Sequence, residues 1–151
     1  MINDFLYDKI KENFPHEATQ QQDELIRQLS SFVTSGTNHI FLMKGYAGTG
    51  KTSVVSALIR AMDELKQPVF LMAPTGRAAK VLSSYSGKPA FTIHKKIYRQ
   101  QTGGDPNGNF SLNVNLHKHT LFIVDEASMI ANASFETNFG SGRLLDDLIE
   151  Y

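Results

Sequence analysis

The clearest chemical pattern in the chain is the glycine-rich loop at residues 45–52. It matches G-x-x-x-x-G-K-[ST], in which glycines let backbone N–H groups turn toward phosphate oxygens. The apolar run 40–43 predicts a buried strand before the loop, and apolar spacing over 53–65 predicts a helix after it. The helix N-terminus adds partial positive charge. The pattern predicts a nucleotide-phosphate site, with Lys51 reaching the β- and γ-phosphates and the Thr52 hydroxyl binding Mg²⁺.

A second set of reactive side chains follows the apolar run 121–124, where Asp125 and Glu126 are adjacent. A buried strand that ends in carboxylates places them where ligands bind in α/β sheets. We expect Asp125 to hold Mg²⁺ opposite Thr52 and Glu126 to accept a proton from the water that attacks the γ-phosphate. Taken alone, the two acids would be assigned to a surface turn. Beside a complete phosphate loop they favour hydrolysis, and they suit activated water better than a small-molecule kinase.

The composition is that of an ordinary soluble domain. The 151 residues carry no formal net charge and no cysteine, which excludes disulfides and cysteine-ligated zinc. The sequence has no apolar run of membrane-spanning length and no signal-peptide layout at its start, so we expect a cytoplasmic protein without membrane contact. Between residues 65 and 104 there are seven lysines and arginines and no acid, which predicts one anion-facing surface.

Strands and helices are predicted to alternate along the chain. Apolar runs predict strands at 69–73 and 121–124, and a period-two pattern over 110–117 predicts a strand or an extended edge segment. Helices are predicted at 20–34, 77–85, after Thr92 and from 144 onward, and Thr19 with Gln22 forms a capping-box pattern. Such alternation indicates an α/β domain with a mostly parallel sheet. We divide the chain into a lead-in at 1–18, with one short helix, and a domain at 19–151.

Four blocks of residues together resemble superfamily-1 DNA helicases, and their RecD-like branch most closely. The blocks are residues 45–52, 73–79, 92–94 and 124–129. They occur in the family's order and cover the chain from about Gln22 to Met129. The resemblance implies a P-loop NTPase fold of the RecA-like type, a parallel sheet flanked by helices, with residues 45–52 as Walker A and 125–126 as Walker B.

The resemblance also implies roles for individual residues. Gln22 aligns with the glutamine that reads the adenine edge, and the other implied contacts are with nucleotide phosphates and single-stranded DNA. The nucleotide-binding set is Gln22, Gly45, Ala47, Gly48, Thr49, Gly50, Lys51 and Thr52, and the catalytic set is Lys51, Asp125 and Glu126. The nucleic-acid set is Pro74, Thr75, Gly76, Arg77, Thr92 and His94.

Several of these residues have a simpler structural interpretation. Gln22 completes the capping box of Thr19, and Thr75 caps the helix that follows it. A lone histidine such as His94 is usually structural or solvated. Aromatic residues of the basic tract could stack on bases, and for Phe91 the interpretation we favour is apolar packing. The aromatic candidates are Tyr85, Phe91 and Tyr98. In the family Ser128 and Met129 help to couple the nucleotide and DNA sites, and we expect Met129 to pack in the core.

The sequence departs from the family pattern at its end. The chain stops before the family's next strand, before its Gly-Asp-x-x-Gln block and before the second RecA-like domain, whose arginine completes the ATP site. In the family that strand lies between the predicted strands 40–43 and 121–124. We therefore expect a sheet truncated at this position, with reduced stability or self-association through open strand edges.

The combined pattern predicts the ATP-binding portion of an ATP-dependent DNA helicase. In the intact protein ATP hydrolysis would be coupled to translocation on single-stranded DNA, while these 151 residues alone would be nearly inactive. The alternative is a P-loop module that binds nucleotide without hydrolytic or helicase activity because its site is incomplete. A small-molecule kinase is a third, weaker hypothesis.

Overall fold

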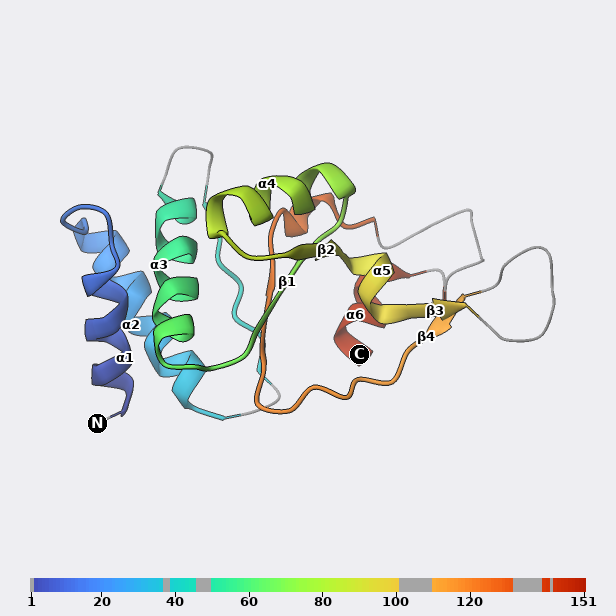
Figure 1. Ribbon diagram of the computed structural model, residues 1–151, viewed down its shortest axis with the longest axis horizontal. Coiled ribbons are helices and arrows are strands. Elements are labelled where there is room, and N and C mark those ends of the chain that lie inside the picture. Colours follow the sequence, from blue (N-terminus) through green and yellow to red (C-terminus); the bar gives the residue numbers. More distant parts are fainter. Residues whose placement is uncertain (1, 37–38, 46–49, 101–109, 132–139, 142) are drawn as a thin grey trace. The chain divides into compact units, whose positions relative to one another are not determined.

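The computed structural model describes residues 2–36, 39–45, 50–100, 110–131, 140–141 and 143–151 (Figure 1). The chain divides into two compact units, each described here by itself. The first consists of Met1–Val69 with His119–Leu121, and the second of Phe70–Lys118 with Phe122–Tyr151. In the described part of the chain, no helix is long and apolar enough to cross a membrane.

Three helices form the first unit. They are α1 (Ile2–Glu12), α2 (Gln20–Thr34) and α3 (Lys51–Glu64), and α1 packs against both of the others. The apolar faces meet in a core of buried side chains, as the amphipathic spacing of each helix requires. This core includes Leu6, Ile10, Phe14, Ile26, Leu29, Val54, Leu58 and Ile59. The predicted helix 20–34 is confirmed with the same bounds.

The N-terminal segment is a helix in which Leu6 and Ile10 are buried, whereas Ile2 and Phe5 are exposed. Polar contacts also tie α1 to α2, and they centre on the Asp23 carboxylate. It accepts a hydrogen bond from the Tyr7 hydroxyl, pairs with Lys11 at 2.8 Å and lies 3.3 Å from Arg27 Nε. The Arg27 guanidinium lies over the Tyr7 ring, 4.3 Å from its centre. The division of the chain at residue 18 stays a prediction.

A three-stranded sheet with the order β2-β1-β5 organises the second unit. The strands are β1 (Val69–Ala73), β2 (Ala90–Thr92) and β5 (Leu121–Val124), so the two predicted strands are confirmed. β1 and β2 are parallel, with Ala73 beside Thr92. Leu121 N donates to Pro68 O, and Asp125 N donates to Met72 O at 3.0 Å. Both partners advance by four residues between these bonds, so β5 also runs parallel to β1.

Helices and a hairpin complete the second unit. α4 (Gly76–Ser86) contacts β2, while α5 (Ile93–Ile97) contacts β2 and α6 (Leu144–Glu150). β3 (Tyr98–Gln100) and β4 (Phe110–Leu112) form an antiparallel pair. The buried core here joins the sheet to α5 and α6 through Met72, Ile93, Ile97, Tyr98 and Leu144. Parallel strands with helices of this order match the predicted P-loop NTPase architecture.

Two strand predictions are wrong in whole or in part. Residues 40–43 form no strand, and Ile40 and Leu42 are 73% and 66% exposed. No strand in the described ranges pairs with this segment, and an apolar run without a neighbour has no ladder to join. The period-two stretch 110–117 is a strand only over β4, and the backbone from 113 is irregular.

Candidate functional site

The end of the glycine-rich loop turns sharply into α3. Gly50 has a left-handed backbone conformation, with φ 82° and ψ 15°, and directly precedes Lys51 at the start of the helix. The Lys51 ammonium donates to the Gly45 carbonyl, and the Thr52 side chain is exposed in the first turn. Among the described residues no side chain caps this helix start, and uncapped N–H groups at the start of a helix are suited to binding an anion. The predicted contacts at Ala47, Gly48 and Thr49 lie outside the described residues.

Gln22 lies beside this loop and also completes the capping box. Its side-chain oxygen accepts from Thr19 N at 2.9 Å, and its backbone N–H donates to the Thr19 hydroxyl at 3.2 Å. A Cβ on Gly50 would collide with the Gln22 amide nitrogen and would lie 3.5 Å from its Cδ. The capping interpretation is confirmed. The amide nitrogen faces the loop, and adenine contact stays a prediction.

The carboxyl ends of the three parallel strands carry the other predicted site residues. Asp125 and Glu126 follow β5, Pro74 and Thr75 follow β1, and Thr92 ends β2. Because the strands are parallel, these residues share one edge of the sheet, the edge where α/β sheets bind ligands. The second unit thus brings together the acid pair and both predicted nucleic-acid blocks. Thr52 belongs to the first unit, and its pairing with Asp125 around Mg²⁺ stays a prediction.

The Asp125 carboxylate is held through both of its oxygens. Oδ1 accepts from Glu126 N at 2.9 Å, and Oδ2 accepts from the Tyr85 hydroxyl at 2.8 Å. Burial and then the Asp125 hydrogen bond raise the pKa of Tyr85 well above its usual range, so it stays a donor. Glu126 is exposed and has a left-handed backbone, with φ 54° and ψ 40°. Such strain in a non-glycine residue is concentrated at functional sites.

Two of the predicted nucleic-acid residues, Thr75 and Thr92, use their hydroxyls to cap helices. The Thr75 hydroxyl accepts from Ala78 N at 3.1 Å at the start of α4, and the Thr92 hydroxyl accepts from Lys95 N at 3.2 Å. Gly76 and Arg77, at the same end of α4, are exposed. An exposed cation at a helix start suits a phosphate backbone.

His94 lies near the core rather than in solvent. Its ring is half-buried and lies 5.7 Å from the Tyr98 ring, centre to centre. Burial lowers the pKa of His94, which favours the neutral imidazole at neutral pH. A neutral ring can donate or accept a hydrogen bond but adds no charge for a phosphate, so its predicted role in strand contact depends on hydrogen bonding.

Two of the aromatic residues in the basic tract, Phe91 and Tyr98, make contacts within the fold. Phe91 stacks on Phe70 with centres 5.4 Å apart, and Lys96 Nζ lies over the Phe70 ring at 4.0 Å. Tyr98 is buried and donates to Asp147 at 2.5 Å. The suggestion that Tyr98 stacks on bases is therefore wrong, and the prediction that Phe91 packs against apolar residues is confirmed.

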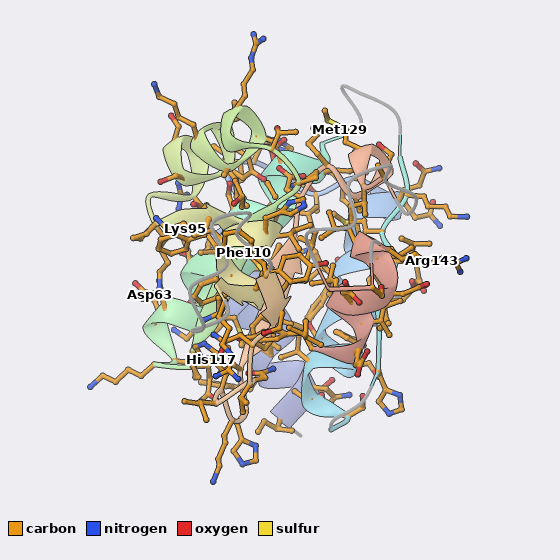
Figure 2. All side chains as sticks on the ribbon, turned by 90° about the vertical axis from the view of Figure 1, so that its right-hand side faces the viewer. Asp63, Lys95, Phe110, His117, Met129 and Arg143 are labelled. Carbon is orange, nitrogen blue, oxygen red and sulfur yellow. The ribbon has the colours of Figure 1, made fainter. Side chains whose placement is uncertain are left out.

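Two side chains differ from expectation in opposite ways. Met129 was expected in the core but is 55% exposed at the end of the 3₁₀ turn η1 (Ala127–Met129) (Figure 2). Tyr85 was one candidate for stacking on bases, and its hydroxyl donates to Asp125, 40 residues away in the sequence. Sequence reasoning missed this contact because no spacing rule links residues so far apart.

The donor set fits a nucleotide-bound Mg²⁺ rather than a metal held by protein alone. Among the described residues, no group of three or more His, Asp or Glu could hold a metal ion. Mg²⁺ with nucleotides needs only one or two protein oxygens besides phosphates and water. The Thr52 hydroxyl and the Asp125 carboxylate are donors of this kind, and their sharing of one Mg²⁺ stays a prediction.

The chain matches the family model described as AAA domain over residues 17–140. It is 32% identical over 136 residues to uncharacterized protein R530 of Acanthamoeba polyphaga mimivirus, covering 74% of this chain and 27% of that protein. It is 30% identical over 115 residues to the ATP-dependent RecD2 DNA helicase of Deinococcus radiodurans, covering 76% and 14%. It is 35% identical over 101 residues to the ATP-dependent DNA helicase dda of Enterobacteria phage T4, covering 65% and 23%. The chain thus spans less than a third of the length of these relatives.

Proposed function

The chain belongs to the AAA domain family and to its RecD-like, superfamily-1 helicase motors, and from this premise we propose that it binds Mg·ATP and contacts single-stranded DNA. The observation that carries the proposal is the shared edge of the parallel sheet. Asp125 and Glu126 lie there beside the block that begins at Pro74 and beside Thr92. An acid pair and two blocks of predicted DNA contacts at one edge of the sheet suit a motor that couples hydrolysis to movement along a nucleic-acid strand.

Each residue has a proposed role at this site. The loop N–H groups and Lys51 hold the phosphates, and Thr52 and Asp125 bind the Mg²⁺. The Mg²⁺, when bound, neutralises charge on the β- and γ-phosphates. Glu126 accepts the proton of the attacking water, for which its exposed carboxylate is suited. Gln22 contacts the adenine through the amide nitrogen that faces the loop.

The nucleic-acid track is proposed to follow the same edge. Backbone N–H groups at the start of α4 and the Arg77 guanidinium contact DNA phosphates, with Thr75, Thr92 and His94 adding hydrogen bonds. Such contacts do not read base sequence, so binding should weaken with salt and be independent of sequence. In the whole protein, a second domain outside these 151 residues is proposed to supply the arginine that completes the site.

The proposal is tested by nucleotide binding and single-turnover hydrolysis with the 151-residue chain. We expect weak Mg·ATP binding and slow hydrolysis, because a missing arginine finger costs about 10³–10⁵ in rate. Lys51→Ala should abolish binding. Lys95→Ala, which replaces an exposed cation outside the proposed phosphate site, is the matched control and should leave it unchanged.

The outcomes separate the candidate functions. Binding that is lost in Lys51→Ala but yields no hydrolysis at all supports the non-hydrolytic module. Equal binding by the unchanged chain and by Lys51→Ala contradicts the phosphate site. For DNA, Arg77→Ala should weaken salt-sensitive binding of oligo(dT), and unwinding of a duplex by the 151 residues alone would contradict the need for a second domain.

A further inference from the structure

Tyr85 has no role in the proposed chemistry, but it contacts Asp125, the proposed Mg²⁺ ligand. It lies in the last turn of α4, and its hydroxyl donates to Asp125 Oδ2 at 2.8 Å. Both residues belong to the second unit, and the bond links α4 to the residue that follows β5. A phenol bound to an ionised carboxylate makes a charge-assisted bond, which is stronger than a neutral one.

The two hydrogen bonds to Asp125 orient its carboxylate but leave some of its lone-pair positions free. Glu126 N binds Oδ1, and the Tyr85 hydroxyl binds Oδ2, so rotation of the group would break one bond or both. An ionised carboxylate has about four lone-pair positions, and these bonds occupy two of them. Each oxygen therefore keeps a position for a metal ion or for a metal-bound water.

α4 does not depend on the Tyr85 hydroxyl for its place. Ala79 and Leu82 of this helix are buried, with exposed fractions of 5% and 0%. Thr75 caps its start, and Gly87 ends it in a left-handed conformation. Removing one partly buried hydroxyl should leave these features in place, and its main effect should fall on Asp125.

We propose that Tyr85 is a positioning residue for Asp125, holding the carboxylate in the orientation that binds the Mg²⁺ of the nucleotide. The proposal rests on the proposed function, since it concerns the same metal. Carboxylates that bind metals are themselves commonly hydrogen-bonded, and loss of such an outer partner typically costs 10–100-fold in metal affinity. Tyr85 thereby links the helix that begins with the DNA-contact block to the metal ligand.

The test is Tyr85→Phe, which removes the hydroxyl and keeps the ring. Binding of a fluorescent ATP analogue is followed by anisotropy while Mg²⁺ is varied, and again in EDTA. We expect the Mg²⁺ concentration for half-maximal binding to rise by about 10–100-fold, with metal-free binding unchanged. A merely structural role would change both measurements together. Tyr7→Phe, which removes another hydroxyl bound to a carboxylate, that of Asp23, is the matched control.

Each outcome decides the matter. An unchanged Mg²⁺ requirement in Tyr85→Phe overturns the positioning role. A lower requirement also overturns it, because the hydroxyl would then compete with the metal. Equal losses with and without Mg²⁺ show a structural role only and overturn it too. If the unchanged chain shows no Mg²⁺-dependent binding, the proposed function fails first and this proposal fails with it.

Discussion

Gln22 lies at the start of α2 and beside the end of the glycine-rich loop. Its side-chain oxygen accepts from Thr19 N at 2.9 Å, while its amide nitrogen occupies the space that a Cβ on Gly50 would need. The two interpretations of Gln22 are therefore compatible, because they use different ends of one amide. The capping bond fixes the direction in which the nitrogen faces.

Gly50→Ala should weaken both stability and nucleotide binding. The φ of 82° costs an L-residue about 1–2 kcal/mol in the free energy of unfolding, and the new methyl group displaces the Gln22 amide. Thermal unfolding and nucleotide titration measure the two effects. Gly87→Ala is the control, because Gly87 has a φ of 71° and no atom of the described residues lies within 4 Å of an added Cβ. The Gly87→Ala variant should lose a similar amount of stability and keep its affinity for nucleotide. Equal affinity losses in the two variants would argue against a local role of Gly50.

Asp23→Asn should make the packing of α1 on α2 less sensitive to acid. The hydrogen bond from Lys11, followed by that from Tyr7, lowers the pKa of Asp23 to about 2. A lowered pKa stabilises the fold above the unfolded value of about 3.9, and this contribution is lost as the pH falls toward 2. The variant should melt at a lower temperature than the unchanged chain at pH 6, and the difference should shrink between pH 4 and pH 2. A difference that stays constant over this range contradicts the assignment.

Local patterns predicted the elements whose burial is set within one segment. The helix 20–34 and the strands 69–73 and 121–124 were found because apolar spacing and apolar runs reflect their own buried faces. The cap of Thr19 and Gln22 was also local. At the site, the sequence also indicated that the acid pair lies at the edge of the sheet. The pair directly follows the apolar run of β5, so its position depends on that strand and not on the conformation of the loops.

Features that depend on distant partners were not predictable. β2 is three residues long and becomes a strand only because it pairs with β1. The run 40–43 had the composition of a strand but has no partner strand in the described ranges, and its apolar residues are exposed. The contacts of Tyr85 with Asp125 and of Tyr98 with Asp147 join residues 40 and 49 positions apart, which no periodicity encodes.

Tyr98→Phe should destabilise the second unit through Asp147. This carboxylate is 3% exposed and accepts from the hydroxyls of Tyr98 and Ser141. Burial alone would raise the pKa of Asp147, but these hydrogen bonds outweigh it and lower the pKa. Loss of one donor to a buried acceptor costs about 1–3 kcal/mol in the free energy of unfolding, measurable by urea denaturation. The loss should be largest above pH 4 and should shrink in acid, where the carboxylate is protonated. An unchanged unfolding midpoint at neutral pH would contradict this role of Asp147.

At Glu126, the substitution that relieves backbone strain should also remove the proposed general base. Its left-handed backbone, with φ 54°, costs roughly 1 kcal/mol or more, a strain that glycine does not carry. Glu126→Gly should therefore raise the free energy of unfolding by up to about 1 kcal/mol and abolish hydrolysis. Glu126→Gln keeps the strain and the shape but removes the base, so it should leave the melting temperature unchanged and slow single-turnover hydrolysis by about 10²–10⁴. Wild-type hydrolysis in Glu126→Gln would exclude this residue as the base, and a lower melting temperature in Glu126→Gly would show that its side chain supports the turn.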